Sequence, residues 1–302
     1  MEPDEVFDST ELNKALASSV RDIISGNEET RKAVAKQVVQ VLSDKIEQSD
    51  ITTLLFSSEN FNINETPSYE LDGELSAYIH TPGSFAPMTQ PRNREFTLPQ
   101  EMISCHIMLP LLQLQSGRYG TIADQLANAE RALLGQINKI ALDTVIAAVP
   151  STTALGNYAS GALTTTTLNA AINYIEDQTG GGRVITGRRN KLSPILDFNT
   201  QTTTLDIFPE SVKEDIVKRG VFGQYRGLPI AGFKQYKTPD GKATLAEDSI
   251  LVLGQDIGRI GFWGAMQNVD DVEIGTLNWH IHAWVLVGAG VFFPERIYRL
   301  VV

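Results

Sequence analysis

Apolar residues recur at helical spacing over one long stretch of the chain, residues 121–149. Thr121 and Asp124 form a Thr-x-x-Asp capping pattern at its start, and Pro150 follows its end. The apolar stripe consists of Leu126, Ala129, Leu133, Ile137, Ile140, Thr144 and Ala148. At 1.5 Å per residue the pattern predicts a single rod of roughly 40 Å, which can brace a flat domain along its length.

Shorter apolar stripes predict further helices. Residues 9–50 show helical spacing twice, each time with one narrow apolar face, so we expect either an arm that docks on another surface or a lid on the chain's own domain. A helix that carries Leu168 and Ile175 should end at the three glycines of residues 180–182. Two more helices are predicted, over residues 188–198 and 209–219.

Apolar runs and alternating patterns predict the strands. Residues 101–114 have the apolar run of a strand that is buried on both faces. The closing stretch alternates from Val272, breaks at Pro294 and should return to the body of the domain as a final strand. Shorter strands are predicted at residues 183–186, 227–232, 250–253 and 259–263. The expected fold class is therefore α+β.

Residues 57–100 differ from the rest because they are rich in proline and poor in branched aliphatic residues. Asp72-Gly73 is the signal of a two-residue type I′ turn, which predicts a hairpin between residues 69–71 and 74–76. An isolated two-stranded ribbon is marginally stable in water, and a structureless loop of this length inside a compact domain is uncommon. We therefore expect this excursion to lean on another subunit.

Composition and charge narrow the class of protein. The 302 residues are 42% apolar and 20% charged, and their formal net charge of −11 argues against a general nucleic-acid binder. Cys105 is the single cysteine, so no intrachain disulfide is expected. The longest apolar run, residues 281–293, is shorter than the roughly 18–20 residues of a membrane span, and the acidic amino terminus does not resemble a secretory signal. We expect no membrane partner and a reducing cytoplasm.

Two glycine-containing segments invite a phosphate-binding interpretation. The glycines at 180–182 follow a helix and precede a strand, which is the reverse of the order in a dinucleotide or P-loop site, so they are interpreted as a helix stop. Residues 187–191, together with Arg183, are the densest basic cluster in the chain. That cluster can pair with a neighbouring subunit, lie in solvent or contact nucleic acid.

No motif in the sequence predicts catalysis or a metal site. His280 and His282 lie on one face of a strand, but no third ligand with metal spacing is near them in sequence, so they are interpreted as two histidines on the less buried face. Cys105 and His106 are adjacent on a strand and point to opposite faces, which excludes a thiolate–imidazole pair. We predict no catalytic, cofactor-binding or metal-binding residues, and no enzyme.

The order of the parts is the most informative feature. An amino-terminal arm is followed by a long extended loop, a strand into one long helix, a mixed insertion and a closing strand. Local matches are Val184-Ile-Thr-Gly before a helix, Gly223-Gln-Tyr-Arg-Gly-Leu-Pro-Ile before a strand, and the ending Gly288-Ala-Gly-Val. This order resembles the major capsid proteins of tailed bacteriophages, which have the Hong Kong 97-like fold.

The resemblance implies a division of the chain into four parts. Residues 1–56 would be the N-terminal helical arm, and residues 57–100 the extension loop. Residues 101–165 and 266–288 would form the peripheral domain, with a spine helix at 121–149. The axial domain would consist of residues 166–265 and 289–302.

The resemblance also implies a function, which is self-assembly through pentamers and hexamers into an icosahedral head shell around a double-stranded DNA genome. Further partners would be a scaffolding protein, a portal and a decoration protein, with only weak contact to the packaged DNA and no cofactor. The location would be the virion, after assembly in the host bacterial cytoplasm. The residues expected at subunit interfaces are Tyr69, Leu71, Leu75, Tyr78, Arg92, Arg94, Glu95, Arg183, Arg188 and Arg189.

One departure from the family can be read from the sequence. Some members join neighbouring subunits through a lysine in the extension loop, whereas this chain has no lysine between Lys45 and Lys139. A covalent cross-link through that loop is therefore not expected. Because the arm is short for a fused scaffolding domain, we expect a separate scaffold or none.

Two other functions compete with this one. The first shares the fold and is the shell of an encapsulin-type nanocompartment, which holds cargo protein in place of a genome. The second is a cytoplasmic α/β enzyme with its site within residues 180–260. DNA inside the particles separates the first from a phage head, and a monomeric chain with ligand-dependent melting would indicate the second.

Overall fold

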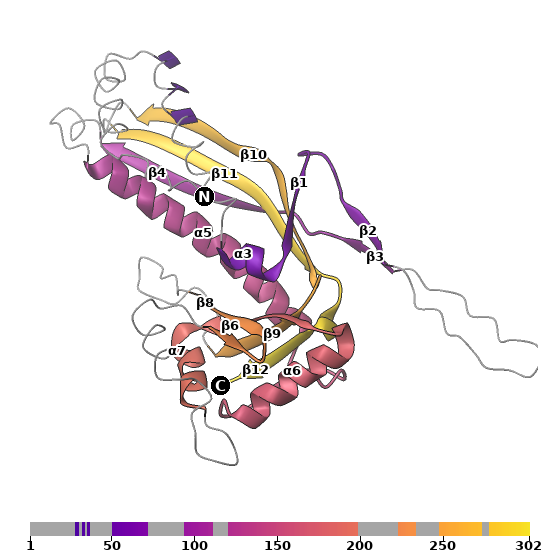
Figure 1. The fold of residues 1–302 in the computed structure, drawn as a ribbon. Coiled ribbons are helices and arrows are strands. Elements are labelled where there is room, and N and C mark those ends of the chain that lie inside the picture. Colours follow the sequence, from indigo (N-terminus) through magenta and orange to yellow (C-terminus); the bar gives the residue numbers. More distant parts are fainter. Residues whose placement is uncertain are drawn as a thin grey trace, which may run out of the picture.

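The computed structural model describes residues 28–29, 32–33, 35–36, 50–71, 94–110, 120–198, 223–233, 248–273 and 278–302. Two sheets with helices packed on them account for most of this part of the chain, and a narrow ribbon projects from one side (Figure 1). Most of the predicted arm, the Asp72-Gly73 turn and the helix predicted at 209–219 lie outside the described residues.

The first sheet has four strands in the order β1-β10-β11-β4. Its strands are β1 (Ser57–Phe61), β10 (Gly258–Glu273), β11 (Asn278–Val291) and β4 (Glu101–Pro110). β10 and β11 form a long antiparallel hairpin, β4 runs antiparallel to β11 at one edge, and β1 runs parallel to β10 at the other. Helix α3 (Asp50–Leu55) precedes β1.

The predicted rod is helix α5 (Gly120–Ala148), which lies along one face of the first sheet (Figure 1). The expected stripe is buried at Ala129, Leu133 and Ile137. Beyond that point the most deeply buried positions are Ala141, Leu142, Val145 and Val149 rather than the predicted Ile140, Thr144 and Ala148. The buried side of the helix turns because the same core continues from the first sheet to residues of the second, including Val184 and Leu251.

Strand β4 corrects the prediction of a strand buried on both faces. Ile103, Ile107 and Leu109 face the core and are at most 8% exposed, whereas Met102 and Met108 face outward and are 66% and 47% exposed. The sequence is apolar on both sides of the strand, but α5 covers only one face of the sheet.

The second sheet has six strands in the order β5-β12-β9-β6-β8-β7. Its strands are β5 (Tyr158–Ser160), β6 (Gly182–Arg188), β7 (Gln224–Tyr225), β8 (Leu228–Phe233), β9 (Ser249–Gly254) and β12 (Ile297–Val301). Every residue of β9 is buried. Ile250 and Val252 pack with helix α6 (Thr165–Thr179), and Leu251 and Leu253 belong to the core shared with α5.

The ends of α6 show how local sequence sets an element boundary. The Thr164 side chain accepts a hydrogen bond from the Thr167 N–H, and the Thr167 side chain accepts one from the Thr164 N–H, which forms a capping box. At the other end Gly180 adopts φ 70°, and its N–H donates to the Glu176 carbonyl. The predicted helix stop at the glycines is therefore confirmed. After β6, helix α7 (Arg189–Leu192) continues into the 3₁₀ helix η1 (Ser193–Asp197).

The ribbon consists of β2 (Ser68–Leu71) and β3 (Arg94–Thr97), paired antiparallel from Ser68 with Thr97 to Leu71 with Arg94. The hairpin predicted between residues 69–71 and 74–76 is not tested, because residues 72–76 lie outside the described residues. The pairing of β2 with β3, more than twenty residues further along, is a long-range contact that the local turn signal does not predict.

Two segments connect the sheets, both at the end of the β10–β11 hairpin where Gly258 pairs with Val291. Residues 255–257 lead from β9 into β10, and residues 292–296, with the 3₁₀ helix η2 (Pro294–Arg296), lead from β11 into β12. Asn157 is fully buried at this junction, where its Nδ2 donates to the Pro294 and Ile297 carbonyls at 2.8 Å. Among the described helices, none combines the length and the apolar character needed to cross a bilayer.

Candidate functional site

The root of the ribbon, defined here as β1, β2, β3 and the parts of β10 and β11 that they contact, is the candidate site. β1 is fixed to the sheet by its parallel pairing with β10 from Ser57 to Phe61. The Phe61 ring lies 5.4 Å from that of Trp263, and the Trp263 Nε1–H donates to the Glu65 carbonyl at 2.8 Å. These contacts hold the chain on the sheet up to the residues just before β2.

Three aromatic rings then attach the ribbon itself. The ring centroids of Tyr69 and Phe96, one from each ribbon strand, lie 4.8 Å and 5.0 Å from that of Phe292. Phe292 directly follows β11, at the junction of the two sheets. Because both strands contact the same ring, the ribbon leaves the body of the protein in a direction set by the end of β11.

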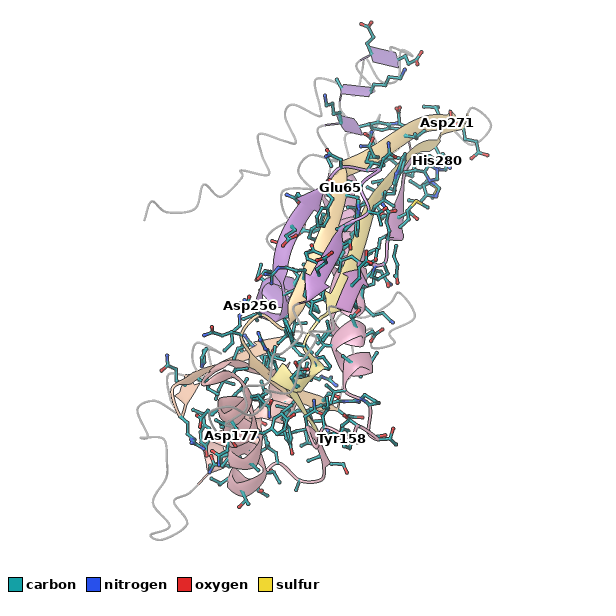
Figure 2. The ribbon with its side chains drawn as sticks, turned by 90° about the vertical axis from the view of Figure 1, so that its right-hand side faces the viewer. Glu65, Tyr158, Asp177, Asp256, Asp271 and His280 are labelled. Atoms are coloured by element: carbon teal, nitrogen blue, oxygen red, sulfur yellow. The ribbon has the colours of Figure 1, made fainter. Side chains whose placement is uncertain are left out.

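A polar network lies beside the aromatic rings. The Tyr69 hydroxyl donates to Glu59 Oε2 at 2.5 Å, and Arg259 Nε donates to Glu59 Oε1 at 3.0 Å. Arg259 also reaches Asp256, which lies where the two sheets meet (Figure 2). Burial and the hydrogen bond to the Glu59 carboxylate raise the pKa of Tyr69 far above its ordinary value, so the hydroxyl remains a donor.

Glycines allow the close approach of the root to the sheet. A Cβ atom at Gly288 would lie 1.7 Å from the Pro99 carbonyl oxygen, and one at Gly290 would lie 2.4 Å from the Phe96 ring. Phe96 of β3 and Pro99, which follows β3, therefore pack directly against the backbone of β11. A larger residue at either position would force β3 and the residues after it away from the sheet.

The root brings some of the sequence-predicted interface residues together. Tyr69 makes the contacts described above, and the Leu71 and Arg94 backbones pair at the end of the ribbon. Glu95 Oε1 accepts a hydrogen bond from the Ser68 hydroxyl at 2.7 Å. The other predicted ribbon residues, Leu75, Tyr78 and Arg92, lie outside the described residues.

The predicted basic cluster is divided by the structure. Arg183 lies near the start of β6 and donates from Nη2 to the Thr53 carbonyl at 2.8 Å, which ties the second sheet to α3. Arg188 ends β6 and Arg189 begins α7, so roughly 16 Å of extended strand separates Arg183 from them. Lys191 turns toward the chain end and donates to the Val302 carbonyl at 2.8 Å.

His280 and His282 lie on the outer, less buried face of the first sheet, as predicted. Sequence reasoning missed that His106 joins them from β4, because the pairing of His106 with His282 depends on strand register. Cys105 points to the other face and packs against the core, and burial raises the pKa of its thiol. In the part of the chain that the structure describes, no group of three or more His, Cys, Asp or Glu side chains is arranged to hold a metal ion.

Comparison with known proteins gives a result only at the level of structure. No protein-family model matches the sequence, and no curated protein sequence matches it either. Among solved structures, the capsid of a native gene transfer agent (GTA) particle shares 9% identity with a TM-score of 0.63, and the match covers 84% of this chain and 90% of that one.

Two phage structures agree with this result. The capsid structure of the cyanophage P-SCSP1u shares 13% identity with a TM-score of 0.56, over 82% of this chain and 86% of that one. A chain from Microbacterium phage Oxtober96 shares 12% identity with a TM-score of 0.61, over 83% and 90%. The chain has the phage capsid fold. The structure and its matches confirm the mixed α+β class that the sequence predicts.

Proposed function

We propose that the chain is the major capsid protein of a tailed phage, and that its copies self-assemble into the icosahedral shell that encloses the double-stranded DNA genome. The observation that carries the proposal is the capsid fold, which extends over more than four fifths of this chain and of the capsid chains that it matches. We assign the chain no catalytic role.

The ribbon supplies a physical reason for assembly. β2 and β3 pair only with each other within the described residues, so each keeps one unpaired edge. Such a two-stranded ribbon is marginal alone and is stabilised when it lies on another surface. We assign residues 57–100 as the extension loop that lies on a neighbouring copy, with Leu71, Leu75, Tyr78, Arg92, Arg94 and Glu95 at that contact.

We assign the remaining parts of the chain to a peripheral domain, an axial domain and an arm. We assign α5 as the spine helix of a peripheral domain, formed by residues 101–165 and 266–288, and the second sheet to an axial domain, formed by residues 166–265 and 289–302. Residues 1–56 would form the arm. Arg183, Arg188 and Arg189 would pair with neighbouring copies around the pentamers and hexamers.

The negative net charge of the chain suits a protein that encloses DNA better than one that binds DNA tightly. The net charge of −11 disfavours tight contact with DNA phosphates, and loosely held DNA can be packaged and released. We place the chain in the virion, after assembly in the bacterial host cytoplasm, with a portal and a decoration protein as further partners and with a separate scaffold or none.

The test is assembly by the full-length chain, followed by negative-stain microscopy and analytical ultracentrifugation. We expect closed particles of uniform size that contain double-stranded DNA when they are taken from infected cells. Particles filled with cargo protein would instead indicate an encapsulin-type shell. A chain that stays monomeric at every concentration and melts at a higher temperature with a metabolite would contradict the proposal.

A sharper test removes the ribbon beyond its root. Leu71 pairs with Arg94, so a two-residue Asn-Gly turn in place of residues 72–93 closes β2 and β3 without moving the root. We expect a subunit with unchanged circular dichroism that no longer forms closed particles. A matched variant with a Gly/Ser linker of the same length in place of residues 72–93 distinguishes the loss of ribbon side chains from the loss of length. Normal particles from both variants would contradict the assignment of the extension loop.

A further inference from the structure

Three of the chain's four histidines meet on the outer face of the first sheet. His106 Nε2 and His280 Nδ1 lie 2.8 Å apart, which is hydrogen-bond distance, so one of the two nitrogens carries the shared proton. The His106 ring also stacks on that of His282, with centroids 3.9 Å apart and an angle of 17° between the planes. His106 therefore contacts both of the other imidazoles.

The cluster joins two strands, one of which has a single neighbour. His106 lies on β4, and both of its imidazole partners lie on β11, where His282 is directly opposite it. β4 is an edge strand of the first sheet, so within the described residues β11 supplies all of its strand pairing. Any repulsion between these side chains acts on the one pairing that holds β4 in the sheet.

The charged groups that face the cluster come from β10. Asp271 is the register partner of His280, and Glu273 Oε2 lies 3.6 Å from His280 Nε2. Figure 2 shows His280 and Asp271 at the same end of the sheet. The described neighbours of His106 and His282 on this face, Met108 and Val269, carry no charge. α5 packs on the opposite face and contributes no charge here.

We propose that His106, His280 and His282 form a proton-sensitive cluster that keeps β4 paired with β11 at neutral pH and loosens this edge of the sheet when more than one imidazole is protonated. A second proton places like charges within a stacked pair or across a 2.8 Å contact, in addition to the loss of the hydrogen bond. This inference concerns the subunit and does not depend on shell formation.

The direction of the pKa shift of His106 supports the proposal. Desolvation, and then the neighbouring imidazoles of His282 and His280, lower the pKa of His106. A histidine whose pKa is lower in the folded than in the unfolded state favours folding above the unfolded pKa and opposes it as the pH falls through the folded one. The effect on β4 should therefore develop below about pH 6.5, and salt should weaken it because the cluster is exposed.

The first measurement is the pH dependence of imidazole C2 hydrogen–deuterium exchange at each histidine of the full-length chain, followed by mass spectrometry in the presence of EDTA. We expect the midpoint of His106 to rise by about half a pH unit in both His282→Gln and His280→Gln. The matched control is His80→Gln, which removes the fourth histidine and should leave the curve unchanged. A His106 midpoint that is the same in all four proteins would overturn the proposal.

The second measurement follows β4 itself. Backbone amide exchange of residues 101–110, corrected for the intrinsic effect of pH, should show a protection loss of roughly three- to tenfold between pH 7.5 and pH 5.0 in the wild type. The loss of protection should be smaller in His282→Gln than in the wild type. If the amide protection of His282→Gln already differs from that of the wild type at pH 7.5, His280→Gln is used in its place. Equal losses in the wild type and the variant, or no loss in either, would show that the cluster does not control this edge.

Discussion

The two sheets of this protein are covered to different extents. In the second sheet, β9 is buried on both faces, with α6 on one side and the core shared with α5 on the other. In the first sheet, α5 covers one face, and the outer face exposes three of the five large apolar side chains found exposed in the described chain, Met102, Met108 and Val269.

The difference shows which part of the subunit is complete in itself. The central strand β9 of the second sheet finds packing partners for both of its faces within one chain. The first sheet keeps an open outer face, and each strand of its ribbon keeps one unpaired edge within the described residues. Under the proposed function, the part that the subunit leaves uncovered is the part that other copies of it cover.

The largest effect on subunit stability is expected in the second sheet. Leu251 is 1% exposed and belongs to the core that joins both sheets, so Leu251→Ala leaves a cavity in that shared core. We expect the free energy of unfolding to fall by about 2–5 kcal/mol, measured by urea denaturation of unassembled subunits. A loss below about 1 kcal/mol would show that the second sheet is not the better packed of the two.

Gly288→Ala tests the close approach at the ribbon root. The added methyl group would overlap the Pro99 carbonyl and approach the Trp263 ring to 3.1 Å, so we expect a loss of about 1–3 kcal/mol and a shift in tryptophan emission. Gly223→Ala is the matched control, because a Cβ at that position meets no atom within 4 Å. Equal stability of the two variants would mean that the root does not rest against β11.

Tyr69→Phe keeps the aromatic contact with Phe292 and removes the hydrogen bond to Glu59. We expect a loss of about 1 kcal/mol at pH 7. The pKa of Tyr69 is raised in the folded chain, so this stabilisation is present below the unfolded pKa of about 10 and is lost at higher pH. Melting temperatures from pH 7 to pH 11 should therefore converge for the two proteins, and Tyr158→Phe provides a tyrosine control.

The smallest effect is expected on the open face. Met102 is 66% exposed, so Met102→Gln should change the free energy of unfolding of the subunit by no more than about 0.5 kcal/mol. The same urea titration used for Leu251→Ala measures it. A loss comparable with that of Leu251→Ala would mean that the outer face is covered within the single chain, and would remove the contrast between the sheets.

Elements with strong local signals could be predicted from the sequence. The spacing of Leu168 and Ile175 predicted α6, and the glycines at 180–182 predicted its end. The long apolar stripe predicted α5, and the break at Pro294 predicted the return of the chain into β12. Each of these signals depends on neighbours within a few residues, which is the range over which helix periodicity and capping act.

The root of the ribbon could not be predicted in the same way. Its polar contacts join Glu59 to Arg259, 200 residues apart, and its rings come from β2, β3 and the end of β11. Alternation along β4 shows which residues share a face, but not whether a helix covers that face. For the same reason His106 and His282, each visible in the sequence, could not be assigned to one cluster before the register of β4 and β11 was known.

The junction between the sheets has a mechanical consequence. Residues 255–257 and 292–296 join the two sheets through the chain at two points, and two hydrogen bonds add further supports, from Arg299 Nη1 to the Val149 carbonyl just after α5 and from Arg183 Nη2 to the Thr53 carbonyl of α3. A plate fixed by two supports can swing about the line between them, whereas a third support away from that line stops the swing. Under the proposed function, copies at positions of different curvature would therefore keep the same arrangement of the two sheets.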